Sequence, residues 1–352
     1  MCWCPAPCTR LECGPKNRAE FPHFGVILKN LTYKLCVSLA LSLCCAAGLR
    51  AADANPWPAQ PVTIVVPFAA GGNTDLMARI AAENLAKAFG KSFLVENRLG
   101  AGGTIAADYV ARAKPDGYTL FMGTLTQIST APFTNKIQYD PIRDFVPIVN
   151  VGGNPFVIAA GGRRGFKSIA DLVRFGKENP GALNVGHAGV GGLTHLSAVL
   201  FLRRAGLEAA MIPYKGGSLV LNDVLGGQID MYSGNLSEVL PHAKGGKLSL
   251  LAVSSDRRLR QLPDVPTLAE TYPGHVVETW NGLLGPAAMP QEVVDRIAAE
   301  MSKALASPEV QARMQAAGIT PIFEVKQAFA QRIQNDITRW KPILEQAGIK
   351  PE

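Results

Sequence analysis

The segment Val62–Phe89, VTIVVPFAAGGNTDLMARIAAENLAKAF, decides the fold because it encodes a buried strand, a tight loop and a helix in succession. Residues 62–66 are apolar or β-branched, which predicts a strand. Beyond the loop, apolar residues recur with a helical period and form one stripe, and Gly90 is the expected stop. The sequence predicts Asn73 or Thr74 as the N-cap of this helix.

The start of this helix is a candidate anion site. Unpaired N–H groups of Gly71, Gly72, Asn73 and Thr74 would converge at the positive end of the helix dipole, where an anion can be held without Lys or Arg. The alternative is that the glycine pair only makes a sharp turn. Neither Gly-x-x-x-x-Gly-Lys-Ser/Thr nor Gly-x-Gly-x-x-Gly is present here, so the segment does not predict a nucleotide-binding site.

The length and composition indicate a globular chain of about two domains. The chain has 352 residues, of which 47% are hydrophobic and 18% charged. Its net charge is +7, but the basic residues are scattered and form no stripe, so no nucleic-acid partner is expected.

Residues 1–54 are predicted to be a signal peptide. Lys29 and Lys34 precede an apolar run over residues 35–49, and Ala52-Asp53-Ala54 has the small-x-small form of a cleavage site. The run is shorter than a membrane-spanning helix usually requires. We therefore expect export with cleavage near Ala54, and the residues before about Val26 resemble an extension from a misplaced start site.

All seven cysteines precede the predicted cleavage site, so the mature chain would have none. This excludes disulfides, thiolate metal sites and cysteine nucleophiles from the mature chain. Gly-x-Ser-x-Gly, Ser-x-x-Lys and His-Glu-x-x-His are also absent from it, which weighs against a secreted hydrolase.

A second strand, loop and helix start follows at residues 183–202. The loop His187-Ala188-Gly189-Val190-Gly191-Gly192-Leu193-Thr194-His195 lacks the third glycine of a dinucleotide motif. His187 and His195 have no accompanying carboxylates, so loop and cap roles are favoured over metal binding. The expected result is a second helix start with free N–H groups.

Strands alternate with helices through the rest of the chain, which predicts mainly parallel sheets covered by helices on both faces. Ser168 begins one helix with a capping pattern, and two amphipathic helices are expected at 291–306 and 327–347. Thr124 and Thr126 follow a predicted strand at 118–122. They are interpreted either as polar ligand contacts or as turn residues.

Six motifs, in this order, closely resemble the Bug family of periplasmic solute receptors of tripartite tricarboxylate transporters. They are Pro67-Phe68-Ala69-Ala70-Gly71-Gly72-x-x-Asp75, Glu96-Asn97-Arg98-x-Gly100-Ala101-Gly102-Gly103, Pro115-Asp116-Gly117-Tyr118-Thr119-Leu120, Tyr214-Lys215-Gly216, Gly226-Gly227-Gln228-Ile229-Asp230 and Leu262-Pro263-Asp264-Val265-Pro266-Thr267. The resemblance covers residues 57–348.

The resemblance implies an α/β fold of the type II periplasmic-binding-protein kind, with two α/β lobes and a ligand cleft between them. One lobe would comprise residues 55–157 and 281–352 and the other residues 158–280, with crossings near 156–161 and 276–284. A ligand carboxylate would be held between loops 68–75 and 188–195, largely by backbone N–H groups and water. The candidate ligand-binding residues are Phe68, Gly71, Gly72, Thr74, Asp75, Thr124, Thr126, Ala188, Gly189, Gly191, Gly192, Thr194, His195 and Asn235.

The expected protein is a monomeric, non-enzymatic receptor in the periplasm that delivers a small carboxylate to the membrane components of a tripartite tricarboxylate transporter. A receptor for a sensor kinase would share the same binding chemistry. No cofactor, metal or nucleic acid is expected. Di- and tricarboxylates, amino acids and aromatic acids all remain open as ligands. Asp75 has three open interpretations: it orients its loop, binds a ligand amine, or only pairs with Arg79. Trp280 has two: it stacks on an aromatic ligand, or it packs the hinge.

Overall fold

The computed structural model describes residues 57–351, and its first sheet contains the segment with which the sequence analysis began. The predicted signal peptide lies outside the described residues. Strand β1 is paired in parallel with β2 on one side and β3 on the other. The elements of this part are β1 (Val62–Val66), α2 (Asn73–Phe89), β2 (Phe93–Asn97), η1 (Ala101–Gly103), α3 (Thr104–Ala111), β3 (Thr119–Thr124), η2 (Thr126–Thr130, a π-helix) and α4 (Ala131–Thr134).

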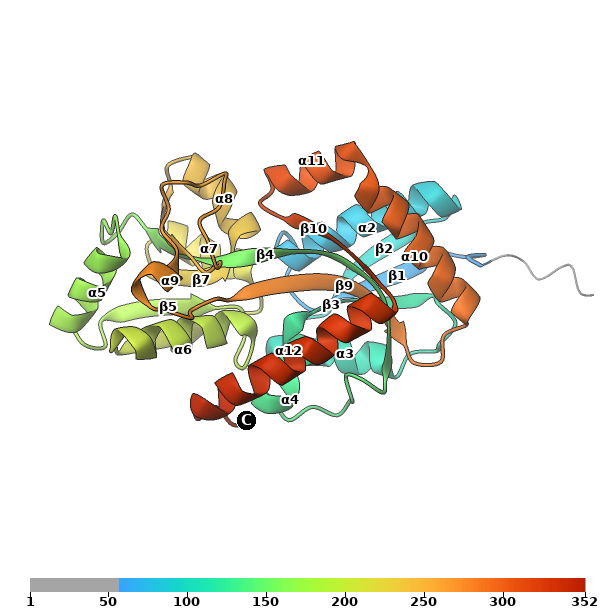
Figure 1. Cartoon of the computed structure of the whole chain (residues 1–352), viewed down its shortest axis with the longest axis horizontal. Helices are drawn as coiled ribbons and strands as arrows, with labels where there is room; N and C mark the ends of the chain where they lie inside the picture. Colours follow the sequence, from blue (N-terminus) through green and yellow to red (C-terminus); the bar gives the residue numbers. More distant parts are fainter. Residues whose placement is uncertain (1–56, 352) are drawn as a thin grey trace, which may run out of the picture. The chain divides into compact units, whose positions relative to one another are not determined.

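Helices cover both faces of this sheet. Successive residues of β1 point to opposite faces, so they pack against different helices. Ile64 packs in one apolar cluster with Ile80 of α2 and Ile297 of α10 (Gln291–Ala306). Val65 packs in the other with residues of α3 and with Trp340 of α12 (Gln327–Gln346). Figure 1 shows α2 and α10 on one side of the strands and α3 and α12 on the other.

The second sheet has the same layered construction. Its strands β6, β5 and β7 are parallel and adjacent in that order, and β8 reaches the sheet through antiparallel pairing with β4 (Phe145–Gly161). The elements are α5 (Ile169–Glu178), β5 (Leu183–His187), α6 (Leu193–Ala205), β6 (Ala209–Pro213), α7 (Gly217–Leu225), β7 (Met231–Asn235), α8 (Leu236–Lys244), β8 (Leu248–Val253) and α9 (Leu268–Thr271). The predicted cap of α5 is confirmed, since the Ser168 side chain accepts from the Asp171 N–H at 3.1 Å.

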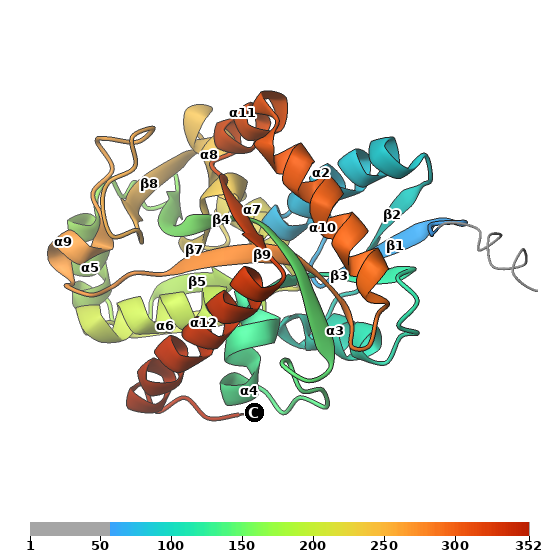
Figure 2. The ribbon, with the colours of Figure 1, turned by 45° about the vertical axis from the view of Figure 1, so that its right-hand side comes forward.

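Two long strands connect the sheets. Strand β4 (Phe145–Gly161) pairs antiparallel with β9 (Glu278–Pro286) along residues 145–155, and with β7 and β8 along residues 156–161. Figures 1 and 2 show β4 and β9 running from one sheet to the other. Successive residues Val157 and Ile158 point into the two apolar clusters of the second sheet.

The expectation of mainly parallel sheets is wrong for these connecting strands. Both pair antiparallel with their neighbours, and so does β10 (Thr320–Val325), which lies beside the first half of β4. The period of a buried strand does not reveal its direction, so the sequence pattern could not predict this.

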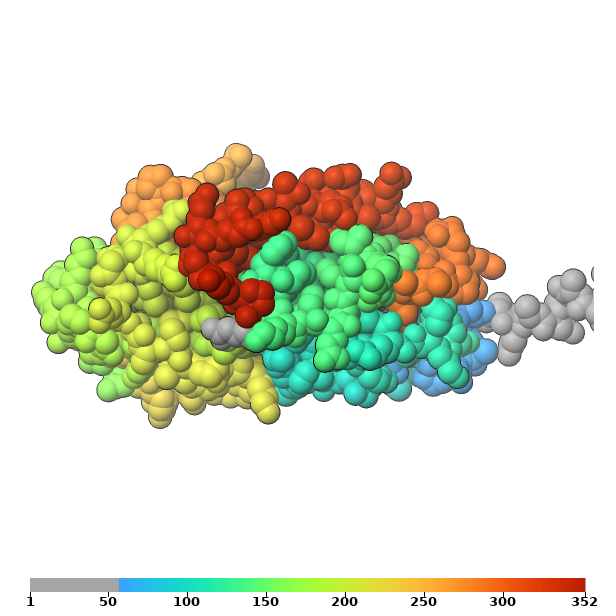
Figure 3. Space-filling view, turned by 90° about the horizontal axis from the view of Figure 1, so that it is seen from below, coloured from blue at the N-terminus to red at the C-terminus, as the bar shows by residue number. Residues whose placement is uncertain are grey.

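The C-terminal helices pack on the first sheet, and α12 also reaches the second. Helix α11 (Pro308–Ala316) follows α10, and α12 places Trp340 and Leu344 in a cluster that includes Leu196 of α6. The space-filling view shows this C-terminal segment in red, lying against both the green residues and the yellow-green residues (Figure 3). Trp280 is buried, packs edge-on against Phe329 and donates its indole N–H to Asp336 at 2.8 Å, so its ring has a packing role.

Candidate functional site

A buried cavity lies between the N-terminal ends of α2 and α6, one helix from each sheet. The space open to the centre of a water molecule is about 30 Å³, which is room for a few waters and too little for a dicarboxylate. Its lining residues are Phe68, Asn73, Thr74, Thr124, Thr126, Phe156, Ala188, Gly192, Leu193, Thr194, Gly217, Asn235, Glu238, Thr279 and Asn281.

The positive charge of this cavity comes from helix ends. Thr74 and Thr194 hold the second positions of α2 and α6, where backbone N–H groups have no partner inside the helix. Each helix start is equivalent to roughly half a positive charge. Glu238 is the one ionisable side chain among the lining residues. The cavity can therefore accept an anion without any Lys or Arg in its wall.

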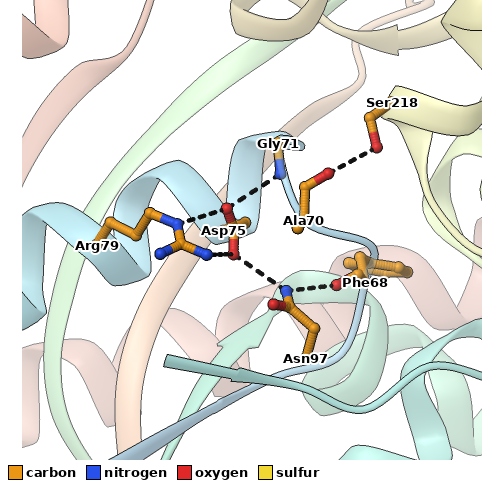
Figure 4. Close-up of polar contacts among 7 residues, drawn as sticks. All are labelled: Phe68, Ala70, Gly71, Asp75, Arg79, Asn97 and Ser218. Carbon is orange, nitrogen blue, oxygen red and sulfur yellow. Dashed lines mark hydrogen bonds and ion pairs between the residues drawn. The ribbon is translucent and has the colours of Figure 1, made fainter. Parts of the chain in front are cut away.

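Asp75 fixes the loop before α2. Its carboxylate accepts from the Gly71 N–H at 3.0 Å, from Arg79 Nε at 2.8 Å and from Asn97 Nδ2 at 3.0 Å (Figure 4). Asn97 also donates to the Phe68 carbonyl at 2.9 Å. Burial raises the pKa of Asp75, but these hydrogen bonds outweigh it, and the pKa lies below its ordinary value. The carboxylate is thus held charged and directed toward its own loop.

The first N–H group of α2 binds a carboxylate from the other sheet. The Asn73 N–H donates to Glu238 Oε1 at 3.0 Å, and Glu238 Oε2 accepts from the Tyr232 hydroxyl at 2.8 Å and from Asn235 Nδ2 at 3.3 Å. Burial raises the pKa of Glu238, and its hydrogen bonds offset part of that rise. The N-cap position belongs to Gly72, which has no side-chain cap bond. The prediction of Asn73 or Thr74 as N-cap is wrong, because Glu238 supplies the capping oxygen from outside the segment.

Hydrogen bonds within the second loop and to it from the first sheet shape the start of α6. The Ala188 N–H donates to Thr194 Oγ1 at 2.9 Å, and the Gly191 N–H donates to His195 Nδ1 at 3.2 Å. The Leu193 N–H donates to Thr126 Oγ1 at 3.1 Å, which ties α6 to the first sheet. No group of three metal-ligating side chains occurs within residues 57–351.

His187 lies under this loop as a neutral side chain. Its ring is buried and stands 4.5 Å, centroid to centroid, from the ring of His195. Burial and the neighbouring charge of His195 lower the pKa of His187 to about 4. A neutral imidazole accepts a hydrogen bond, and Nδ1 of His187 accepts one from the Gly189 N–H at 3.4 Å.

Direct contacts join the two sheets beside the cavity. The Ala69 N–H donates to the Lys215 carbonyl at 3.2 Å, and the Ser218 hydroxyl donates to the Ala70 carbonyl at 3.0 Å (Figure 4). Gly189 and Gly102 also meet here, because a Cβ on Gly189 would stand 2.9 Å from the Gly102 Cα. The two sheets are therefore in direct contact beside the cavity.

Some of the predicted site residues line the cavity, and others do not. The residues in the wall are Phe68, Thr74, Thr124, Thr126, Ala188, Gly192, Thr194 and Asn235. Those outside it are Gly71, Gly72, Asp75, Gly189, Gly191 and His195. These six belong to the same two loops and shape them.

The sequence analysis missed several residues of the wall, above all Glu238 and Asn281. Asn281 is a fully buried amide between Trp280 and the run Gly282-Leu283-Leu284 of β9, and a polar residue at that place in a buried strand was the available signal. Glu238 lies in the first turn of α8, where an acid is common, so nothing local set it apart.

The fold and the cavity define a periplasmic binding protein with two α/β lobes and a binding site between them. The chain belongs to the tripartite tricarboxylate transporter family receptors (TctC), whose family model matches residues 77–349. This family consists of solute-binding receptors and not of enzymes. In residues 57–351 no helix combines the length and the apolar character that crossing a bilayer requires.

Individual relatives agree with this assignment. Protein BugT of Bordetella pertussis is 33% identical over 312 residues, which cover 86% of this chain and 94% of BugT. The structure of R. palustris Rpa4515 with adipate superimposes with a TM-score of 0.81 at 32% identity, covering 84% of this chain and all of the other. MatC from Rhodopseudomonas palustris with bound malate gives 0.78 at 33% identity, covering 82% of this chain and all of MatC.

Proposed function

We propose that this protein captures a small carboxylate in the periplasm and delivers it to the membrane components of a tripartite tricarboxylate transporter. The observation that carries the proposal is the convergence of two helix starts, α2 and α6, on one cavity whose wall has no basic side chain. Two related proteins of about one-third identity have been solved with adipate and with malate, which are both carboxylates.

The carboxylate binds to backbone N–H groups in this proposal. Thr194 at the start of α6 and Thr74 at the start of α2 both line the cavity, and their N–H groups are the donors in this proposal. The Thr126 hydroxyl already bridges the sheets by accepting from Leu193, and its proton is available to a ligand oxygen. Because these groups come from both sheets, the ligand gains its full set of contacts only when the sheets close.

The two lobes divide where β4 and β9 pass between sheets. Residues 55–157 and 281–352 form one lobe in this proposal, and residues 158–280 form the other. The register of β4 supports this division, since its pairing partner changes from β9 to β7 between Pro155 and Phe156. Bending of these two strands then opens and closes the site.

Thermal unfolding tests the proposed function. The mature chain, starting at Asn55 and refolded to remove co-purified ligand, is heated with a panel of carboxylates and with the matching amides. A ligand at about 100 times its Kd stabilises the folded state by about 2.7 kcal/mol, which raises Tm by several degrees. We expect an acid to raise Tm and its amide to have no effect. A neutral or cationic solute that raises Tm while no carboxylate does so would contradict the proposal.

A further inference from the structure

We infer that the ligand is a zwitterion, a carboxylate that also carries an ammonium group, and that Glu238 binds the ammonium. This inference rests on the proposed function and specifies the ligand class of the same cavity. It starts from Glu238, the one ionisable side chain in the wall.

Glu238 has no cationic partner in the described part of the chain. Its hydrogen bonds come from the Asn73 N–H, the Tyr232 hydroxyl, and the side-chain amide and backbone N–H of Asn235, which are all neutral donors. A partly buried carboxylate without a counter-ion is unfavourable in a protein, unless a ligand supplies the opposite charge.

Two further acceptors share the cavity with Glu238. Asn281 is fully buried, and neither its Oδ1 nor its Nδ2 atom has a hydrogen-bond partner within residues 57–351. Oδ1 of Asn235 is unpartnered in the same range, while its Nδ2 is directed to Glu238. Buried polar atoms without partners are rare. An ammonium group has three N–H donors and no acceptor, which matches one carboxylate and two amide oxygens.

The charges of the cavity also match a zwitterion. The starts of α2 and α6 together supply about one positive charge, and Glu238 supplies one negative charge. A neutral zwitterion leaves this balance unchanged, with its carboxylate between the starts of α2 and α6 and its ammonium at Glu238. A dicarboxylate without an ammonium group would bring a second negative charge toward Glu238 in a poorly solvated space, with no positive charge to offset it, which is unfavourable.

The glycine opposite Glu238 shows that this carboxylate is built into the site. A Cβ on Gly217 would stand 2.3 Å from Glu238 Oε2 and 2.3 Å from the Tyr232 hydroxyl oxygen. Only glycine leaves room for the carboxylate and its phenol partner at this point of α7.

The test compares ligands that share a carbon skeleton and differ in the amino group. Calorimetric titration of the refolded mature chain at pH 7.5 uses L-aspartate, L-malate and succinate as one set, L-glutamate and glutarate as a second, and L-phenylalanine and 3-phenylpropionate as a third. We expect the amino acid of at least one set to bind at least tenfold more tightly than its relatives without nitrogen. In Glu238→Gln that preference falls at least tenfold, whereas Glu345→Gln, which removes an exposed carboxylate from α12, leaves it unchanged.

Three results would overturn the inference. Succinate or malate binding as tightly as aspartate, with no amino acid preferred in the other sets, shows that the ammonium is not recognised. Tighter amino-acid binding by Glu238→Gln shows that Glu238 repels the ligand. Either result leaves the proposed carboxylate receptor intact. If no acid of any set binds while a neutral solute does, the proposed function fails together with this inference.

Discussion

The backbone N–H of Asn73 donates a hydrogen bond to Glu238 Oε1 at 3.0 Å, although 165 positions separate the two residues in the chain. The bond joins the start of α2, beside the first sheet, to the first turn of α8, beside the second. A movement that separates the sheets therefore breaks it. The same carboxylate caps a helix, closes the cavity and forms part of its wall.

Replacing Asp75 with Asn is expected to loosen the first loop. The variant loses the ionic bond to Arg79 and weakens the bond to the Gly71 N–H, and the unfolding free energy should fall by about 1–2 kcal/mol. Urea unfolding measures this. Glu83→Gln is the control, because it removes exposed ion pairs and should cost less than 1 kcal/mol. An Asp75→Asn protein as stable as wild type would show that the loop does not depend on the carboxylate.

Acid should destabilise the fold partly through His187. The folded-state pKa of this histidine is about 4, below the ordinary value of 6.5, so the unfolded chain binds the proton more readily. The contribution of His187 is fully present above pH 6.5 and is lost as the pH falls toward 4, by up to about 3 kcal/mol. Urea unfolding between pH 7.5 and 4.5 should show a shallower pH dependence for His187→Gln. An identical pH dependence in the variant and in wild type would contradict this assignment.

Closure of the two sheets should depend on Gly189. An added Cβ would clash with Gly102 across the closed site, so Gly189→Ala should weaken carboxylate binding at least tenfold. Small-angle scattering should also show a larger radius of gyration with ligand present than in wild type. Gly206→Ala is the matched control, because it places alanine at a positive φ where nothing lies within 4 Å. It should lose about 1 kcal/mol of stability and no affinity. Equal losses of affinity in both variants would rule out a role in closure.

Replacing Asn281 with Leu should separate binding from stability. The unpartnered, fully buried amide is unfavourable in the unliganded protein, so the variant should be more stable by about 1 kcal/mol, a rise in Tm of roughly 2–4 °C. Its affinity for amino acids should fall at least tenfold. Calorimetry measures both quantities. A variant that is less stable and binds normally would show that the amide serves the fold.

Local sequence patterns predicted much of this structure. Strand β1 and helix α10 at Gln291–Ala306 have the expected bounds, and helix α2 ends where expected, because their apolar periods and end signals are strong. Helix α2 begins one or two residues earlier than the predicted N-cap implied, at Asn73. Helix α12 ends one residue earlier than expected, at Gln346. The π-helix at Thr126–Thr130 was not predicted, since no sequence period distinguishes it from an ordinary helix.

The sequence predicted only some of the residues that line the cavity. Both helix starts could be found because glycines and hydroxyl residues follow buried strands there, and the resemblance to the Bug family singled out the same loops. Glu238 and Asn281 reach the cavity through the antiparallel pairing of β4, β7 and β9, which joins residues far apart in the chain. No pattern within one segment carries that information.

The central claim is that a ligand carboxylate binds to N–H groups at the starts of α2 and α6. Nitrogen-15 NMR of the labelled mature chain, titrated with the acid that raises Tm most, tests it directly. We predict that the amide protons of Thr74 and Thr194 shift downfield on saturation, as expected for hydrogen bonds to an anion. The amides of Gly90 and Gly206, at the opposite ends of the same helices, should move little. Saturation without movement at Thr74 and Thr194 would contradict the account.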